Sequence, residues 1–283
     1  MAWKVLEQRQ TDALLRFLGT REAACVAFTS HIYDGSQVSI PSRRQGRLLV
    51  REVSSEITGA ILQLSSGLYF PVLDRSNPFI EASALGGLAR MTPRIYSAMG
   101  TKVDVLAFER ALRREPFQSL DYHLMTQTHV PAEPTFPKLP AGLEVFEASS
   151  RDVDRLFDIQ KNYEIEEVLL PGNTFHAASS RRHLEETLRT QLVLYAELGG
   201  TPIAKVGTNA RGIFYDQIGG VFTEKRLRSR GISSFLMTEL LERIRRAHKN
   251  GTLFVKKDNG PALTMYSNLG FTIEDEFRIS YFG

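Results

Sequence analysis

A run of prolines near the middle of the chain is the strongest single constraint on what this sequence can fold into. Residues 130–140 hold four of the 12 prolines of the 283-residue chain. Proline removes a backbone N–H and fixes φ, so this run blocks helix propagation and central strands and favours an extended, polyproline-like segment. We interpret residues 130–142 as a linker between two domains, residues 1–129 and residues 143–283. The alternative is a long proline-rich loop inside one domain.

Size and composition agree with two ordinary globular units. Domains average roughly 150 residues, so 283 residues supply two units that can each bury a core. Hydrophobic residues make up 42% of the chain and charged residues 24%, which excludes fibrous and disordered classes for most of it. The net charge of +3 is too small for a dedicated nucleic-acid binder, so we expect no nucleic-acid partner.

The sequence gives no indication of a secretory leader or a membrane segment. Charge begins at Lys4, before an apolar signal core could form. No stretch approaches the roughly 18 uncharged apolar residues of a membrane span. We therefore predict a cytoplasmic protein with no membrane partner.

Cysteine and histidine usage predicts no metal site. Cys25 is the only cysteine, so neither an internal disulfide nor a cysteine-based zinc site can form. It lies in the apolar run 23–28, and we interpret it as a core residue rather than a nucleophile. His31, His123 and His129 are scattered without the spacing of metal ligands.

The first half alternates between helical and strand-like patterns. This alternation predicts a mixed α/β domain with a central sheet, and no recognisable catalytic motif lies in it. Pro71 favours an edge position for its strand, because proline cannot donate to a sheet ladder. The expected helices cover residues 3–19, 22–33, 78–90 and 102–114, and the expected strands cover residues 47–53, 58–64, 69–73, 96–99 and 121–128.

The second half has a sharper pattern. Gly199 and Gly200 separate two apolar runs, which indicates a β-hairpin. The expected helices cover residues 150–164, 178–190, 231–248 and 259–268, and the expected strands cover residues 192–198, 202–207, 213–223, 252–256 and 272–282.

A basic loop between a strand and a long helix, within residues 220–234, is suited to bind an anion. The first amides of a helix have no intrahelical partner, and the helix dipole adds positive charge there. Arg226, Arg228 and Arg230 crowd this loop, and Gly231 lets an anion approach the backbone closely. The pattern predicts a phosphate or pyrophosphate site. A solvated basic turn capped by serine is the alternative.

A second segment, residues 257–271, contains a short helix with a tyrosine on its apolar face. Pro261 suits the first position of that helix, and Gly270 suits its C-terminal cap. Taken alone, Tyr266 fits a core residue better than a catalyst.

Together the two segments resemble the GNAT superfamily of acyl-CoA N-acyltransferases. That family has a [Q/R]-x-x-G-x-[G/A] loop between a strand and a helix, and residues 228–233 follow it except that Ser233 replaces the small Gly or Ala. Downstream the family often shows N-x-x-A-x-x-x-Y-x-x-x-G-F, which residues 259–271 match in full. The resemblance implies an α/β fold with a mixed sheet: a GNAT fold in residues 143–283 and, from element order, a degenerate GNAT-like copy in the first half.

The resemblance also implies a coenzyme site and no metal. The backbone of Val221, Phe222 and Thr223 would hydrogen-bond the pantetheine arm of acetyl-CoA, the co-substrate. Asn259 and Ala262 would lie at the coenzyme, with Asn259 near the thioester. The loop amides would hold the pyrophosphate, and we expect binding to survive the change at Ser233. The implied loop residues are Arg228, Ser229, Arg230, Gly231, Ile232, Ser233 and Ser234.

Tyr266 would donate a proton to the departing thiolate, as a neutral phenol can. The candidate bases that deprotonate the amine are Asp216, on the strand that leads to the loop, and Glu164 and Glu167, in an acidic helical region that often lines the acceptor site. A solvated acidic helix end is the alternative for the glutamates, and water can also carry the proton.

The resulting hypothesis is an N-acetyltransferase that moves an acetyl group from acetyl-CoA to a primary amine of a small molecule or peptide. The pattern leaves room for a homodimer. Two alternatives stay open: a non-catalytic acyl-CoA-binding regulatory module, and an aminoacyl-tRNA-dependent transferase. As a degenerate GNAT-like copy, the first half would help form the acceptor site or an interface and would not bind coenzyme.

Overall fold

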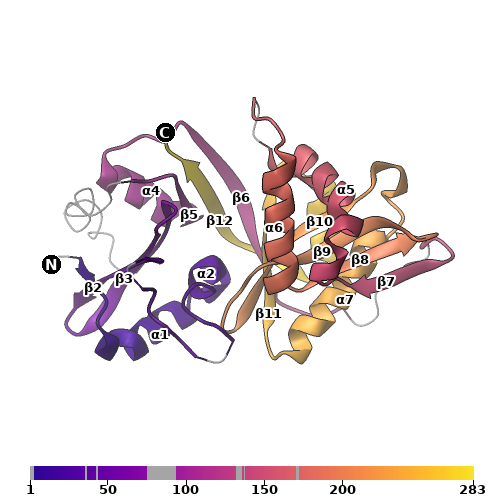
Figure 1. Cartoon of the computed structure of the whole chain (residues 1–283). Coiled ribbons are helices and arrows are strands. Elements are labelled where there is room, and N and C mark those ends of the chain that lie inside the picture. The colour runs from indigo at the N-terminus through magenta and orange to yellow at the C-terminus, as the bar shows by residue number, and fades with distance from the viewer. Residues whose placement is uncertain are drawn as a thin grey trace.

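One continuous mixed sheet organises the whole chain. The computed structural model describes residues 3–35, 37–42, 44–74, 94–131, 136, 138–169 and 172–283. Within these residues the strands form one 12-stranded sheet in the order β1-β2-β3-β4-β5-β12-β6-β11-β10-β9-β8-β7. Figure 1 shows the two halves side by side, with β6 and β12 running between them. The predicted α/β class with a mixed sheet is confirmed.

The two halves share much of their element order over the described residues, and in both the fourth and fifth strands are parallel neighbours. The first half contains β1 (Lys4–Val5), η1 (Gln8–Gln10), α1 (Thr11–Gly19), α2 (Glu22–Thr29), β2 (Gly46–Val53), β3 (Glu56–Leu64), β4 (Leu68–Leu73), β5 (Ser97–Thr101), α4 (Lys102–Leu112) and β6 (Gln118–Gln127). The second half contains β7 (Leu143–Glu147), η3 (Ser150–Asp152), α5 (Val153–Tyr163), the π-helical turn η4 (Glu164–Val168), α6 (Ala177–Thr190), β8 (Val193–Leu198), β9 (Thr201–Arg211), β10 (Tyr215–Thr223), η5 (Lys225–Leu227), α7 (Ile232–Arg246), β11 (Asn250–Lys256), α8 (Gly260–Asn268) and β12 (Phe271–Tyr281).

The halves exchange their last strands. β6, from the first half, lies between β11 and β12 of the second. β12, from the second half, lies between β5 and β6 of the first. The proposed division at residues 130–142 therefore describes chain order, whereas the sheet passes through both halves without a break. Residues 132–135 and 137 of that segment lie outside the described residues.

Alternating side chains of the strands supply a core on both faces of the sheet. On β8, Leu194 packs with α7 and α8, whereas Val193 and Tyr195 pack with α5 and α6. Successive residues of a strand point to opposite faces, so the two helix pairs cover opposite sides. The first half repeats this, with Leu49 facing α4 and Leu48 facing α1 and α2.

Most predicted elements are present, with two corrections. Gly199 and Gly200, with φ of 58° and 75°, form the predicted hairpin turn. The predicted helix over residues 3–19 is wrong at its start, where the short strand β1 pairs with β2. The edge position predicted from Pro71 is also wrong, because β4 lies between β3 and β5. The predicted helix at 78–90 falls outside the described residues.

The edge prediction failed because the pairing of β4 with β5 ends before Pro71, so the missing N–H interrupts no hydrogen bond to β5. The parallel pairing of β4 with β5 joins Leu68 to Ser97 and Tyr69 to Ala98 and ends there. Pro71 follows, at the point where the two strands diverge. Separately, no described helix is long and apolar enough to cross a membrane.

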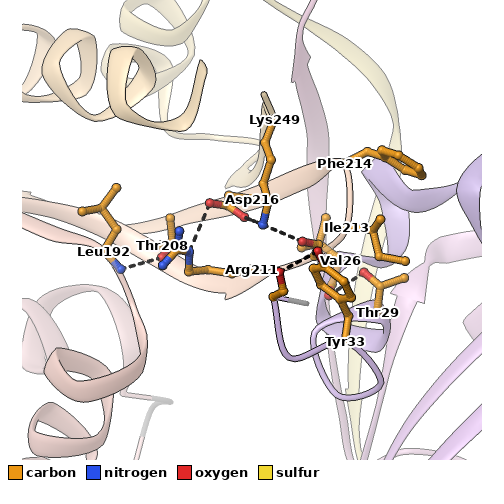
Figure 2. A network of polar contacts seen from close by, with 12 residues as sticks. Val26, Thr29, Tyr33, Leu192, Thr208, Arg211, Ile213, Phe214, Asp216 and Lys249 are labelled. Atoms are coloured by element: carbon orange, nitrogen blue, oxygen red, sulfur yellow. Dashed lines mark hydrogen bonds and ion pairs between the residues drawn. The ribbon is translucent and has the colours of Figure 1, made fainter. Parts of the chain in front are cut away.

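A buried carboxylate fastens helix α2 of the first half to the second half. Glu22 is 1% exposed, and its oxygens accept hydrogen bonds from the backbone amides of Ile213 at 2.6 Å and Phe214 at 2.7 Å. The Thr29 hydroxyl donates to the same carboxylate at 2.7 Å. On β11, the Thr252 hydroxyl donates to the Ala23 carbonyl at 3.0 Å. Figure 2 shows the β9–β10 turn of the second half held against α2.

Removing this carboxylate should destabilise the fold. We expect Glu22→Ala to lower the free energy of unfolding by about 3 kcal/mol, because two buried amides lose their acceptor. Urea unfolding followed by circular dichroism measures this change. The exposed Glu56 is the matched control, and Glu56→Ala should stay within about 0.5 kcal/mol of the parent protein. Equal stabilities of the two variants would contradict the role given to Glu22.

Candidate functional site

Strands β10 and β11 diverge halfway along their length. Their parallel pairing joins Tyr215–Ile218 to residues 250–253 and ends there. From Gly219 onward, β10 continues beside β9, where Phe222 and Thr223 pair with Lys205 and Ala204. The backbone of residues 219–223 thereby turns an edge toward the space between β10 and β11. Strand edges of this kind accept an extended ligand as an added strand.

A glycine bulge marks the point of divergence. The register of β10 against β9 shifts between Gly219 and Phe222, and Gly220 has a φ of 63°. A Cβ on Gly219 would collide with the Asn209 side chain, and a Cβ on Gly220 would lie 3.1 Å from Lys205 Nζ. Glycine is therefore favoured at Gly220 by the positive φ, whereas a side chain at Gly219 would displace the exposed Asn209 side chain.

The N-terminus of α7 faces the same end of β10. Ser229 and Gly231 have φ of 61° and 81°, and the first helical hydrogen bond runs from Phe235 N to Gly231 O at 2.9 Å. The amides of Ile232 and Ser233 precede that bond and point out of the helix end. The exposed Arg230 precedes them, and a helix N-terminus with free amides and a nearby arginine is the kind of turn that suits an anion. The predicted strand, loop and helix order is present, and the Arg228 amide of the predicted set donates to the Lys225 carbonyl at 3.3 Å.

Two loop residues tie this turn to its surroundings. Arg228 Nε donates to the Thr223 carbonyl at 2.9 Å, and its Nη1 lies 2.6 Å from the Glu166 carboxylate. The Arg228 hydrogen bond, with the charges of Arg228 and Lys225, holds the pKa of Glu166 below its usual range. Ser233 Oγ lies 2.6 Å from Thr223 Oγ1, so the serine that departs from the GNAT pattern joins α7 to the end of β10.

Helix α8 holds Tyr266 in the core of the second half, within electrostatic reach of Tyr163 and Glu167. Asn259 caps this helix, since its Oδ1 accepts from the Ala262 amide at 3.2 Å, and Pro261 occupies the first turn. The Asn259 side-chain NH₂ remains as a donor on the same group. Tyr266 is 8% exposed, and burial, followed by the charges of Tyr163 and Glu167, raises the pKa of its phenol. The phenol therefore stays protonated at neutral pH.

Tyr163 and Lys205 complete the cluster at the bulge. Lys205 is 6% exposed, and its Nζ lies 4.4 Å from the centre of the Tyr163 ring. Burial lowers the pKa of Lys205 to about 8, and the charge of Glu164 opposes this shift. Burial raises the pKa of Tyr163 to about 12, with a hydrogen bond to the Gly220 backbone acting in the opposite direction. Glu164 accepts a hydrogen bond from Gln160 Nε2 at 2.7 Å.

The first half contributes a third tyrosine. Tyr122 on β6 stands opposite Lys256 of β11, and its ring centre lies 5.2 Å from that of Phe254. Burial raises the pKa of Tyr122 to about 12, and the charges of Tyr281, Tyr163 and Glu167 add to the shift. Lys256 Nζ forms an ion pair with Glu167 Oε2 at 3.1 Å. The strand exchange thus places a first-half side chain within electrostatic reach of the second-half cluster.

One candidate base lies away from this cluster. Asp216 is fully buried near the start of β10, where it forms ion pairs with Lys249 at 3.1 Å and Arg211 at 3.3 Å. Figure 2 shows these contacts beside the β9–β10 turn. The Gly220 bulge is four residues further along, roughly 13 Å at the rise of a strand. Lys249 Nζ also donates to the Gly212 carbonyl at 2.6 Å, so Asp216 supports the β9–β10 turn, whose amides contact Glu22 of α2.

Comparisons with solved structures identify the fold. A Drosophila protein of known structure shares it with a TM-score of 0.69 at 14% identity, over 99% of this chain and 98% of its own. A tandem GNAT protein from the clavulanic acid biosynthesis pathway gives a TM-score of 0.60 at 13% identity, over 99% and 98%. This chain has a tandem GNAT fold. An acetyltransferase of the GNAT family from Colwellia psychrerythraea gives 0.54 at 11% identity, over 99% of both chains.

Sequence comparison adds a match within the second half. The family model described as FR47-like protein matches residues 209–279, which run from β9 to β12. No curated protein matches the sequence. The GNAT fold expected from the two motifs and the GNAT-like first half expected from element order are both confirmed.

The contacts at the bulge also bring three residues to the candidate site that sequence reasoning missed. Lys205 carried a usable signal, because it is the one charged residue within the strand run 202–207. Tyr163 precedes the glutamates already considered, and only its contact with the bulge distinguishes it. Tyr122 carried no signal, since its place depends on pairing between β6 and β11, far apart in sequence.

The lowered pKa of Lys205 makes a testable statement about stability. The folded-state pKa of about 8 lies below the ordinary 10.5, so the unfolded chain binds more protons between these values and stability should rise with pH there. Below pH 8 the burial of the charged Lys205 ammonium lowers the free energy of unfolding by its full amount, on the order of 3 kcal/mol. We expect Lys205→Met to be more stable than the parent at pH 7 and to lose the rise in stability toward pH 9.5.

Urea unfolding at the two pH values measures the effect, and Lys225→Met, at a side chain 77% exposed, is the control. If Lys205→Met kept the parent's pH dependence of stability, the lowered pKa of a buried Lys205 would be ruled out as its cause.

Proposed function

We propose that the protein is an acyl-CoA-dependent N-acyltransferase that uses acetyl-CoA and acylates a primary amine. The end of the β10–β11 pairing at the Gly219–Gly220 bulge carries this proposal, because the α7 turn follows β10 there and Tyr266 lies within electrostatic reach of Tyr163 at the bulge. The tandem GNAT fold supports the proposal, as do the two motifs in the second half.

The residues of the cleft fit a coenzyme. The edge backbone of Val221, Phe222 and Thr223 suits the amide groups of a pantetheine arm, which can pair with it as an added strand. The amides of residues 232–234, with Arg230 nearby, suit a pyrophosphate. When bound there, acetyl-CoA supplies the acyl group in activated thioester form. Asn259, at the start of α8, offers its amide NH₂ to the coenzyme near the thioester.

We assign proton donation to a neutral tyrosine and proton removal from the amine to a carboxylate. Tyr266 Oη stays protonated in its buried setting, so it can donate to the departing sulfur. Glu164 and Glu167 are the carboxylates of the cluster and can take the proton of the amine, directly or through water. We leave Asp216 out of this chemistry because its two ion pairs hold it at the other end of β10. Much of the rate would come from aligning amine and thioester.

The first half would complete the acceptor side. Tyr122 stands next to the Lys256–Glu167 ion pair, on a strand that belongs to the first half in sequence. This placement supports an acceptor site built from both halves, with the first half supplying a wall and no coenzyme loop. Small-molecule and peptide amines both fit this proposal.

The proposed role of the α7 turn in coenzyme binding can be tested by adding one methyl group at Gly231. The parent protein should give saturable heat with acetyl-CoA in calorimetry, and Gly231→Ala should weaken binding by about tenfold, because the backbone needs a positive φ and close approach by the anion. Gly142→Ala carries the same backbone strain, with a φ of 77° and no atom within 4 Å, and should bind normally. No heat from the parent at millimolar coenzyme would refute the proposed function.

The role of Tyr266 predicts a split between rate and affinity. Tyr266→Phe should lower kcat by about a hundredfold, since it removes the proton donor, and should leave the acetyl-CoA Kd within about twofold. Free-thiol release over a panel of amines measures the rate, and Tyr215→Phe, near the start of β10, is the control. An unchanged kcat would remove Tyr266 from the mechanism, and binding without turnover on any amine would indicate a regulatory coenzyme-binding module.

A further inference from the structure

Lys205 carries a buried ammonium to which no carboxylate is paired. The residue is 6% exposed, and no hydrogen bond or ion pair to its Nζ comes from any residue that the structure describes. What the ammonium meets is the Tyr163 ring, whose centre lies 4.4 Å away. Lysine is almost never fully buried unless its charge is paired. An unpaired ammonium in this position therefore indicates an anionic ligand.

The alternation of β9 shows which side of the sheet the ammonium lies on. Ala204 and Val206 pack in the core with α7, so Lys205, between them, points to the other face. Phe222 of β10 is directly opposite Lys205, and it packs on that other face with α5. Its ring centre lies 6.2 Å from that of Tyr163. The ammonium is therefore on the α5 side of the sheet, away from the helix that we propose for the pyrophosphate.

The glycine bulge places this ammonium at the reacting end of the proposed coenzyme. A Cβ on Gly220 would lie 3.1 Å from Lys205 Nζ, so the ammonium lies directly against the bulge. With the pyrophosphate at the α7 turn, beyond Thr223, a pantetheine arm would run back along β10 and bring its thioester to the bulge. A ligand that binds Lys205 would then lie next to the acyl group.

The charges around Lys205 match a ligand that carries both signs. At a pKa of about 8, Lys205 is mostly charged at pH 7, so it acts there as a cation rather than as a base. Glu164 is within electrostatic reach of it, and Gln160 Nε2 donates to that carboxylate at 2.7 Å. Glu164 is also one of the two groups proposed to take the proton of the amine. A negative group for an amine and a positive group for an anion thus lie near each other.

We propose that the acceptor is a free amino acid and that Lys205 binds its carboxylate. This inference rests on the proposed function, since it names the acceptor of the same site. An ammonium offers three donors to a carboxylate, in a charge-assisted contact. The amino group of the bound molecule, only a few bonds away, would then lie at Glu164 and the thioester. A long peptide with its two ends far apart does not present both charges together.

The transfer step follows from this placement. Glu164 takes one proton from the ammonium of the acceptor, directly or through water, and leaves a neutral amine. The amine lone pair forms the N–C bond to the acyl carbon, the C–S bond breaks, and the sulfur leaves with the Tyr266 proton. A second proton from the nitrogen restores the Tyr266 phenol. The products are an N-acetyl amino acid, free coenzyme A and one proton.

The inference is tested on the full chain with acetyl-CoA and matched pairs of acceptors. Each common amino acid is compared with its carboxamide, which keeps the amine and the side chain and loses the negative charge. Free-thiol release gives kcat/KM, expressed per unprotonated amine because the two amines differ in basicity. We expect at least one amino acid to exceed its carboxamide by about a hundredfold, mostly through KM.

Three variants connect this preference to the ammonium. Lys205→Met should reduce the ratio to within about threefold of unity, by raising KM for the amino acid. Lys205→Arg keeps the charge with a different shape and should retain a preference of about tenfold. Lys161→Met removes an exposed lysine of α5 and should keep the ratio of the parent. Urea unfolding of each variant separates a lost preference from a lost fold.

The inference is overturned if no amino acid is acylated faster than its carboxamide, or if Lys205→Met keeps the preference. A second arm replaces acetyl-CoA with succinyl-CoA. If Lys205 were needed for succinyl transfer to the carboxamides, its partner would be the carboxylate of the acyl group, and the inference would also fail. Calorimetry with acetyl-CoA separates the two proposals. Heat without a carboxylate preference contradicts the inference alone, whereas absence of heat refutes the proposed function and this inference with it.

Discussion

The hydrogen-bonded pairing of β6 with β12 holds the rest of the structure together. It runs from Phe271 opposite Gln127 to Tyr281 opposite Gln118, along the whole of both strands. Each of these strands belongs to one half in sequence and also pairs with a strand of the other half, β6 with β11 and β12 with β5. Neither half can complete its own sheet, because the strand that covers its open edge comes from the other. The proline run separates two stretches of sequence without separating two sheets.

A similar strand pattern carries different side chains in the two halves. In the second half, two strands part at Gly219 and Gly220, and arginines surround the nearby helix turn. In the first half, two strands part before Pro71, and acidic side chains line the opening. The divergence of neighbouring parallel strands is a property of the fold, whereas the charge at the opening is a property of the side chains.

Local signals predicted the elements well, and pairing between distant strands escaped them. The hairpin at Gly199–Gly200, helix α7 and the α8 segment from Asn259 to Phe271 each depend on neighbours in sequence, so their signatures were visible. The edge prediction from Pro71 failed because the proline ends a pairing on one side while its strand stays interior. Tyr122 and Glu22 act across the junction between the halves, where composition and periodicity carry no information about partners.

The exchange of strands also constrains the order in which the strands can pair during folding. β12 follows every other strand in the chain, and it must enter between β5 and β6 before the first half has its full set of neighbours. A ribosome therefore releases the first half with its sheet unfinished, and that sheet closes only after the second half has been synthesised. Contacts of this sequence separation slow folding and expose strand edges in the meantime. The first half therefore cannot place β12 beside β5 until the second half has been synthesised.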